Sequence, residues 1–168
     1  PRRPGRRPGP PPLRPPDRHA AAEGLIGSLA RDTGIRPVAP LLPAIRDEVL
    51  AVLNAPEIAF LFDTGTLAEV PITAELPGLG RVHGVIDRLL VSPHRVLAVD
   101  FKSNRVVPDT PKAVPEAILR QMGAYAEALA QIYPDRRIET AIVWTRNANY
   151  MPLSHDLVTP AMVRARSP

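Results

Sequence analysis

The chain has 168 residues, of which 45% are hydrophobic and 23% charged, as in an ordinary soluble globular protein with one compact domain. It contains no cysteine, which excludes a disulfide scaffold, a thiolate nucleophile and a cysteine-ligated zinc or iron–sulfur site. No apolar run is long enough to span a membrane, and no apolar segment follows the basic N-terminus. We therefore expect a cytoplasmic protein with no membrane partner.

The positive charge is concentrated at the N-terminus. Residues 1–18 carry six arginines and one aspartate, a net charge of +5, so the other 150 residues together carry −1. Eight of the first 16 residues are proline, which favours a disordered or polyproline-like segment. We expect 1–18 to be a Pro/Arg-rich tail or linker, with a weak phosphate-binding arm as the alternative, and 19–168 to be the folded domain. Because the chain begins without Met, we also expect it to be a fragment of a longer protein.

Two helices are expected before any strand. Residues 20–31 form a weak candidate that contains two glycines. Residues 41–54 form a stronger one, because apolar residues recur at helical spacing along one face. The residues of this apolar stripe are Leu42, Ile45, Val49 and Leu53.

Three strands are predicted next, at 67–76, 81–91 and 96–102. Pro71 lies in the first of them and indicates an edge strand or a bulge. The third strand is apolar up to Asp100, a pattern typical of a strand that is covered on both faces.

The strongest helix is predicted at 115–132, followed by a fourth strand at 137–144 that can lie parallel to an earlier one. Residues from 151 onward show little pattern. The order of elements indicates an α/β fold with a mixed sheet flanked by helices.

Three ionisable residues interrupt the apolar strands. Asp87 lies in the segment GVIDRLL, and Asp100 and Lys102 lie in LAVDFKSN. Residues two apart in a strand share a face, so Asp100 and Lys102 project together while Phe101 points the other way. Asp87 lies on the preceding strand of the same hairpin, where a position close to Asp100 is plausible.

Such a group is suited to metal-assisted hydrolysis of a phosphodiester. Two nearby carboxylates repel each other, and a hard divalent cation relieves that repulsion. A bound cation can polarise a phosphate and lower the pKa of water, and a lysine can orient the water or stabilise negative charge. The alternative is a solvated ion pair, because the tripeptide D-x-K is common.

The segments that carry these residues resemble conserved motifs of the PD-(D/E)xK nuclease superfamily, in its RecB-like branch. GVIDRLL, VDFKSN and QMGAYAEAL resemble GxIDRL, VDYKTN and QLxxYxxAL. AEVP at 68–71 and IVWT at 142–145 resemble two further strands, most closely those of AddA-type helicase–nucleases. The resemblance covers about residues 40–155.

The resemblance implies a restriction-endonuclease-like mixed central sheet and a DNA nuclease of double-strand break repair, most simply an exonuclease. It implies Asp87 and Asp100 as metal ligands for Mg²⁺ or Mn²⁺, with the Phe101 carbonyl as a third, and Lys102 as the catalytic lysine. Gln121 and Tyr125 would line the site or contact DNA, since i and i+4 share one helical face. The sequence alone favours the alternative that Tyr125 faces the core and Gln121 lies at its boundary. The partners would be a helicase motor in a missing N-terminal part and an AddB-like subunit.

One departure from the family pattern bears on activity. The family usually has a histidine ligand on an early helix, and Gly27 stands at that position here. His83 could approach the site, with a solvent-facing strand position as the alternative. Glu69 could add an acidic group, with a surface strand position as its favoured alternative. A catalytically degenerate module that binds DNA or a helicase partner is therefore the second hypothesis. A mobile-element or CRISPR-associated exonuclease is the third, although those commonly carry cysteine ligands.

Overall fold

The computed structural model describes residues 41–165, without the side chains of the two residues 42 and 165. The tail predicted at 1–18, the helix predicted at 20–31 and Gly27 lie outside the described residues. The chain divides into two compact units, residues up to Leu50 and residues from Ala51 onward. Helix α2 (Leu42–Asn54) begins in the first unit and ends in the second, and all other described elements belong to the second.

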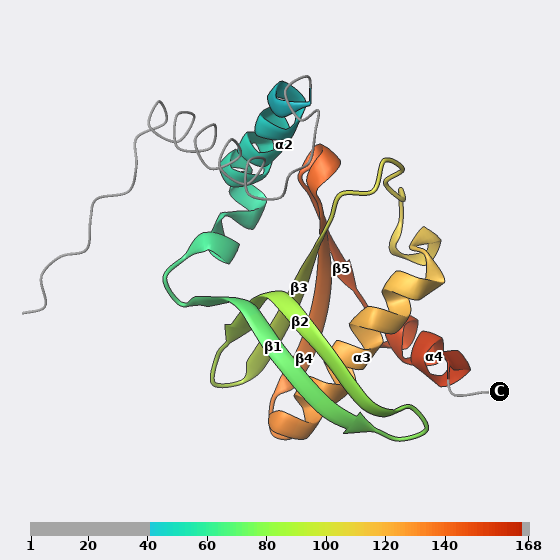
Figure 1. The fold of residues 1–168 in the computed structure, drawn as a ribbon. Helices are drawn as coiled ribbons and strands as arrows, with labels where there is room; N and C mark the ends of the chain where they lie inside the picture. Colours follow the sequence, from blue (N-terminus) through green and yellow to red (C-terminus); the bar gives the residue numbers. More distant parts are fainter. Residues whose placement is uncertain (1–40, 166–168) are drawn as a thin grey trace, which may run out of the picture. The chain divides into compact units, whose positions relative to one another are not determined.

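The second unit has three consecutive strands, followed by helices and strands in alternation (Figure 1). Its strands are β1 (Thr66–Leu76), β2 (Gly80–Val91), β3 (Arg95–Lys102), β4 (Arg137–Trp144) and β5 (Asn149–Leu153). Its helices are α3 (Glu116–Ile132), α4 (His155–Ala165) and the short 3₁₀ helices η1 (Pro56–Phe62), η2 (Pro111–Ala113) and η3 (Thr145–Asn147). None of the described helices is both long and apolar enough to cross a membrane.

The five strands form one mixed sheet in the order β1-β2-β3-β4-β5. All neighbouring pairs are antiparallel except β3 and β4, which are parallel and are connected through α3. This confirms the predicted α/β class and the predicted parallel placement of the fourth strand. Pro71 lies on an edge strand, as predicted, where a missing backbone donor is tolerated.

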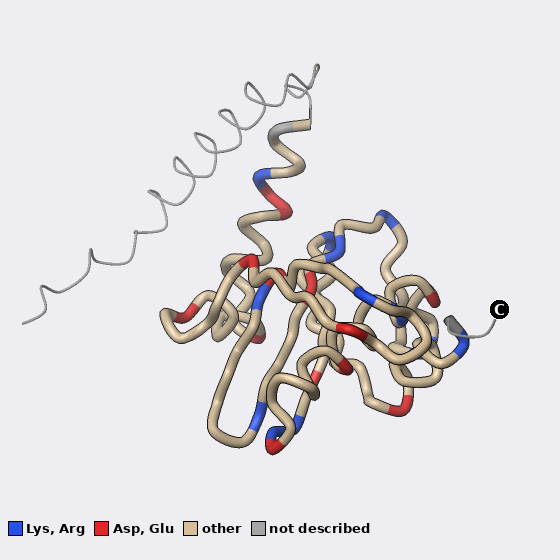
Figure 2. Tube along the Cα trace, turned by 60° about the horizontal axis from the view of Figure 1, so that its bottom comes forward, with Lys and Arg blue, Asp and Glu red and all other residues tan. Residues whose placement is uncertain are grey.

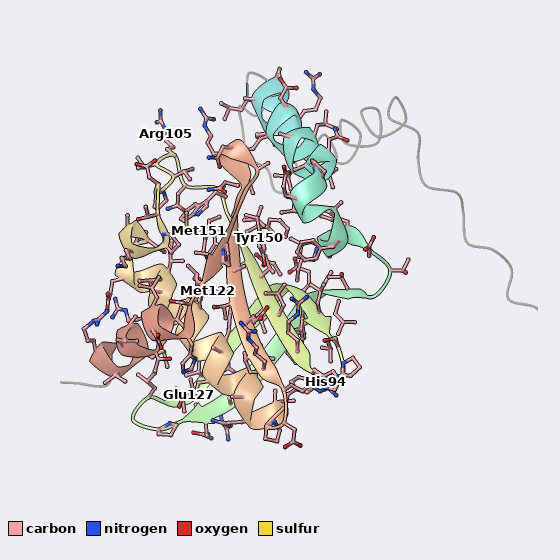
Figure 3. All side chains as sticks on the ribbon, turned by 180° about the vertical axis from the view of Figure 1, so that it is seen from behind. His94, Arg105, Met122, Glu127, Tyr150 and Met151 are labelled. Carbon is pink, nitrogen blue, oxygen red and sulfur yellow. The ribbon has the colours of Figure 1, made fainter. Side chains whose placement is uncertain are left out.

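Apolar side chains cover both faces of the sheet. On one face, α3 and α4 pack against the strands, and Met122 and Met151 lie between helix and sheet (Figure 3). On the other face, η1 packs against a second apolar cluster through Ile58 and Leu61. Strand β3 contributes alternate residues to the two clusters, which confirms that it is covered on both sides. These residues are Val96 and Ala98 on one face and Leu97 and Val99 on the other.

Strand β5 and helix α4 were not predicted, because residues from 151 onward show little pattern in the sequence, and each contains a proline. Pro152 lies in β5, which is an edge strand and so tolerates it. Pro160 lies at the middle of α4, where it removes one backbone donor and the helix nevertheless continues to Ala165. The helix predicted at 41–54 is present, but Ile45 and Val49 of its apolar stripe remain largely exposed.

Candidate active site

Strands β2 and β3 separate at the position of Asp87. Their ladder ends with the pair Arg88 and Val99, although β2 continues to pair with β1 as far as Gly80. Strand β3 continues to pair with β4 as far as Lys102. The β1–β2 hairpin therefore runs away from β3, β4 and β5 beyond this point (Figure 1). The separation leaves the last residues of β3 without a backbone partner in β2.

Asp87 bridges the point of separation with its side chain. Its Oδ2 accepts a hydrogen bond from the backbone amide of Phe101 at 2.7 Å. Continuing the β2–β3 register places Asp87 opposite Asp100. The amide and carbonyl of one strand residue face the same neighbouring strand, so the Phe101 carbonyl also faces the side of Asp87. The cross-strand proximity expected from the hairpin is therefore present.

Asp100 is a buried carboxylate, with its residue only 3% exposed. Burial raises its pKa, the hydrogen bond and charge of Lys102 lower it, and the charge of Asp87 raises it further. Lys102 Nζ lies 2.6 Å from Asp100 Oδ2, but this oxygen accepts no well-angled hydrogen bond. The charge of Lys102 thus compensates only part of the cost of burying Asp100.

Gln121 and Tyr125 of helix α3 complete the cluster. Gln121 Oε1 accepts a hydrogen bond from Lys102 Nζ at 2.8 Å, and Gln121 Nε2 donates to Asp100 Oδ1 at 3.3 Å. Gln121 Nε2 also lies 3.0 Å from the Tyr125 hydroxyl, which donates to the Val85 carbonyl at 2.8 Å. The structure therefore brings together all five side chains that sequence reasoning placed at the site.

The histidines of the described chain lie elsewhere. His83 is exposed and forms a hydrogen bond with Thr73 at 2.9 Å, as its solvent-facing alternative predicts. His94 and Arg105 lie at opposite ends of the sheet (Figure 3). Arg105 follows β3 closely, so His94 is at the end far from the cluster. His155 begins α4 and pairs with Thr159. None of the three is placed to complete the cluster.

Glu69 occupies an unusual position in β1. The β1–β2 register places it opposite Asp87, but the two residues do not form a ladder pair. Its φ is 52°, a left-handed conformation that is uncommon for a residue with a side chain. Within residues 41–165, no three His, Cys, Asp or Glu side chains gather closely enough to hold a metal ion. Glu69 is thus opposite Asp87 in register, but it does not form a three-residue metal-binding group with Asp87 and Asp100.

The residues present still fit a hard divalent cation. Asp100 is a buried carboxylate whose Oδ2 is contacted by Lys102 Nζ without a well-angled hydrogen bond, and Asp87 carries a second carboxylate across the gap. Carboxylate and backbone carbonyl oxygens are the ligands that such cations prefer. A cation held by Asp87, Asp100 and the Phe101 carbonyl would need water for its remaining positions.

The far face of the sheet carries a contact that sequence reasoning missed. The Phe101 ring stacks on Phe62 at a centroid distance of 6.3 Å, and the guanidinium of Arg88 lies 5.3 Å from the centre of the Phe62 ring. This stack supports the residue whose amide and carbonyl face the site. The alternation of strand side chains placed Phe101 on this face, but nothing in the sequence indicated Phe62 as its partner.

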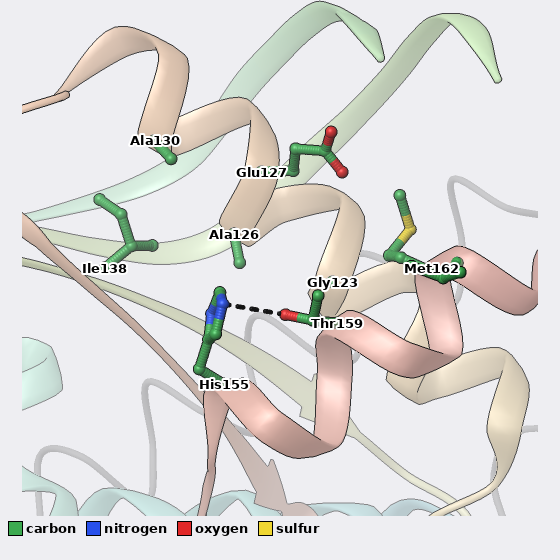
Figure 4. A pocket seen from close by; sticks show the side chains of 9 residues that line it. Gly123, Ala126, Glu127, Ala130, Ile138, His155, Thr159 and Met162 are labelled. Carbon is green, nitrogen blue, oxygen red and sulfur yellow. Dashed lines mark hydrogen bonds between the residues drawn. The ribbon is translucent and has the colours of Figure 1, made fainter. Parts of the chain in front are cut away.

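A cavity of about 380 Å³ lies between α3 and α4 (Figure 4). It is lined by Gly123, Ala126 and Ala130 of α3, which project about half a turn away from Gln121. His155 and Met162 of α4 lie on its other side. The cavity therefore contains none of the site residues.

Charge gives no further indication of the site. Basic and acidic residues are interspersed over the described trace (Figure 2), although the segment 47–80 carries six acidic residues and no basic one. Many of them form exposed pairs, such as Arg81 with Glu75 and Arg164 with Glu116. The cluster around Asp100 is distinguished from these by its burial.

Three comparisons with known proteins bear on this arrangement. A model of the PD-(D/E)XK nuclease superfamily matches residues 17–159. A subunit of the ATP-dependent helicase/nuclease of Oenococcus oeni is 34% identical over 62 residues, which are 37% of this chain and 5% of that protein. A solved structure, "Crystal structure of SSO0001", aligns over 89% of this chain and 69% of its own, with 13% identity and a TM-score of 0.41.

Proposed function

Because the chain belongs to the PD-(D/E)XK nuclease superfamily, we propose that it cleaves DNA at the cluster formed by Asp87, Asp100 and Lys102. One observation supports this most directly. Asp87 holds the Phe101 amide across the separated strands, next to a buried Asp100 that is paired with Lys102. Burying this ion pair costs free energy of desolvation, which a surface ion pair does not. A charged pair kept at such a cost favours a functional role.

The carboxylates of Asp87 and Asp100 and the Phe101 carbonyl would hold Mg²⁺ or Mn²⁺. When bound, the cation would lower the pKa of water and polarise the phosphate. Lys102 would orient the attacking water or stabilise negative charge on the phosphate. We expect in-line attack that leaves a 5′-phosphate, while Gln121 and Tyr125 line the site.

The broader setting is proposed from the helicase/nuclease relative. The chain spans 5% of the length of that protein, so the activity of a whole helicase–nuclease is a proposal here. We propose that this domain is an exonuclease that trims strands at double-strand breaks and is supplied with DNA by a helicase motor. A cytoplasmic location and an AddB-like partner protein stay predictions.

A nuclease assay tests the proposal. The purified chain should degrade DNA with Mg²⁺ or Mn²⁺ and not with EDTA, and linear DNA should be cut in preference to circular DNA. Lys102→Ala, purified in the same way, should abolish cleavage, which excludes a contaminating nuclease. His83→Ala, an exposed change on β2, should leave cleavage intact and so show that the loss is specific to Lys102. Full cleavage by Lys102→Ala would refute the assigned role.

A degenerate binding module is the second candidate. It is favoured by the absence of a third acidic or histidine side chain at the cluster within residues 41–165. Such a module would bind DNA without cutting it. Titration with Mn²⁺ separates the two candidates, because an active site should bind the ion in a manner that depends on both Asp87 and Asp100.

A further inference from the structure

The ring of Tyr125 lies directly against the backbone of β2 at Gly84. A Cβ atom added to Gly84 would lie 2.7 Å from Tyr125 Cε1 and 3.2 Å from its hydroxyl oxygen. Real Cβ atoms do not approach other atoms so closely, so an alanine at this position would displace the ring. Gly84 is therefore required for space at a point where α3 crosses β2.

The close approach brings the Tyr125 hydroxyl within 2.8 Å of the Val85 carbonyl, which has no proton to give. The hydroxyl must therefore donate to Val85 and is left to accept from Gln121 Nε2, which lies 3.0 Å away. Burial raises the pKa of Tyr125, which keeps the hydroxyl protonated and able to donate.

This arrangement fixes the orientation of the Gln121 amide. With Nε2 directed to the Tyr125 hydroxyl and to Asp100 Oδ1, the amide oxygen faces Lys102 Nζ at 2.8 Å. A reversed amide would place its NH₂ group against the ammonium, two donors without an acceptor. Hydrogen-bond donation thus runs in one direction, from Lys102 through Gln121 and Tyr125 to the Val85 carbonyl.

We propose that Gly84 and Tyr125 are positioning residues, which set the Gln121 amide so that the Lys102 ammonium and the Asp100 carboxylate are held in place for catalysis. The proposal rests on the proposed function, because Lys102 and Asp100 are its reacting groups. It differs from a DNA-contacting role for Tyr125, which is only 5% exposed and uses its hydroxyl within the protein.

Steady-state kinetics of Tyr125→Phe and Gly84→Ala test the proposal. We expect kcat to fall about tenfold in each variant, with KM for DNA unchanged within about twofold, because the reacting groups shift while the DNA surface does not. Gly65→Ala is the matched control, since an added Cβ there meets no atom within 4 Å. A higher KM at unchanged kcat would overturn the proposal in favour of a DNA contact.

A double-mutant cycle makes the test specific to the contact between the two residues. Tyr125→Leu removes the ring atoms that a Cβ at Gly84 would meet, so adding Gly84→Ala to Tyr125→Leu should cause no further loss of kcat. Independent, multiplicative losses would show that Gly84 acts in another way and would overturn the pairing. Tyr125→Phe keeps the ring in place, so it remains informative if Gly84→Ala does not fold.

A readout that needs no cleavage separates this inference from the proposed function. The side-chain amide signals of Gln121, assigned by their loss in Gln121→Ala, should shift in the NMR spectra of Tyr125→Phe and Gly84→Ala but not in Gly65→Ala. Inactive wild-type protein would refute the nuclease function, and the NMR result would then decide the positioning of Gln121. Unchanged Gln121 signals in both variants would overturn the positioning role whatever the activity.

Discussion

The carboxylate of Asp87 lies 2.7 Å from the backbone amide of Phe101 and takes the place of the next backbone hydrogen bond in the β2–β3 ladder. One side chain thus ends the strand pairing and also brings a negative charge to the end of β3. A residue with both roles connects the stability of the sheet with the chemistry proposed for the site. The two roles can be separated by substitution.

Asp87→Asn should retain the fold and lose the activity. The asparagine oxygen can still accept from Phe101, but the negative charge is gone, so we expect metal-dependent cleavage to fall by at least about 100-fold. Asp87→Ala should lose the hydrogen bond as well. Its free energy of unfolding should fall by about 1 kcal/mol, so that it unfolds at a lower urea concentration. Nuclease assays and urea denaturation of both variants measure the two effects. Equal stability of the two variants would contradict the structural role.

Asp100→Asn should make the metal-free protein more stable at neutral pH. Burial raises the pKa of Asp100 in the folded state, so its contribution to stability is complete below the unfolded pKa and is lost as pH rises through the folded pKa. The asparagine avoids that loss. Urea denaturation in EDTA should therefore show a gain for the variant that grows as the pH rises above about 4, the ordinary pKa of an aspartate. A gain that shrinks with rising pH would contradict this account.

Terbium luminescence should report directly on cation binding. Trp144 is the single tryptophan of the sequence, and the β3–β4 register pairs it with Lys102 on the adjacent strand. Adjacent strands lie about 4.8 Å apart, so a cation bound near Asp100 would accept energy from the excited indole. We expect sensitised Tb³⁺ emission that Mg²⁺ competes away and that Asp87→Asn and Asp100→Asn each abolish. Emission that persists in both variants would place the ion elsewhere.

Sequence reasoning predicted the cluster because its spacing is local. Asp100 and Lys102 share a strand face, and Asp87 lies on the adjoining strand of one hairpin. Gln121 and Tyr125 were placed at the site by the family resemblance, and their i, i+4 spacing puts them on one face of the helix. The catalytic roles of these residues stay predictions.

The remaining features depend on contacts between segments that are distant in sequence. The stack of Arg88 on Phe62, and of Phe62 on Phe101, joins η1 to β2 and β3, and no periodicity indicates it. The pairing of Gly84 with Tyr125 was equally hidden, although a glycine inside a predicted strand is a sign of close backbone approach. Strand β5 and helix α4 were missed because the sequence from 151 onward shows little apolar periodicity.

Helix α4 depends on a second close approach, at Gly123 of α3. A Cβ there would lie 2.7 Å from the Val158 carbonyl oxygen and would also overlap the Met162 side chain. Met162 is flexible and can move, but the backbone of α4 cannot give way without shifting the helix. Gly123→Ala should therefore destabilise the protein by about 1–3 kcal/mol, although alanine is the better helix former.

Thermal and urea denaturation of Gly123→Ala measure this cost, with Gly65→Ala as the control that adds a Cβ in open space. Because Gly123 projects away from Gln121, the variant should keep its kcat at temperatures where it remains folded. A large loss of kcat in the folded variant would show that the packing of α4 on α3 also controls the site. Unchanged stability would show that α4 shifts without cost, so that its contact with α3 at Gly123 does not contribute to the stability of the fold.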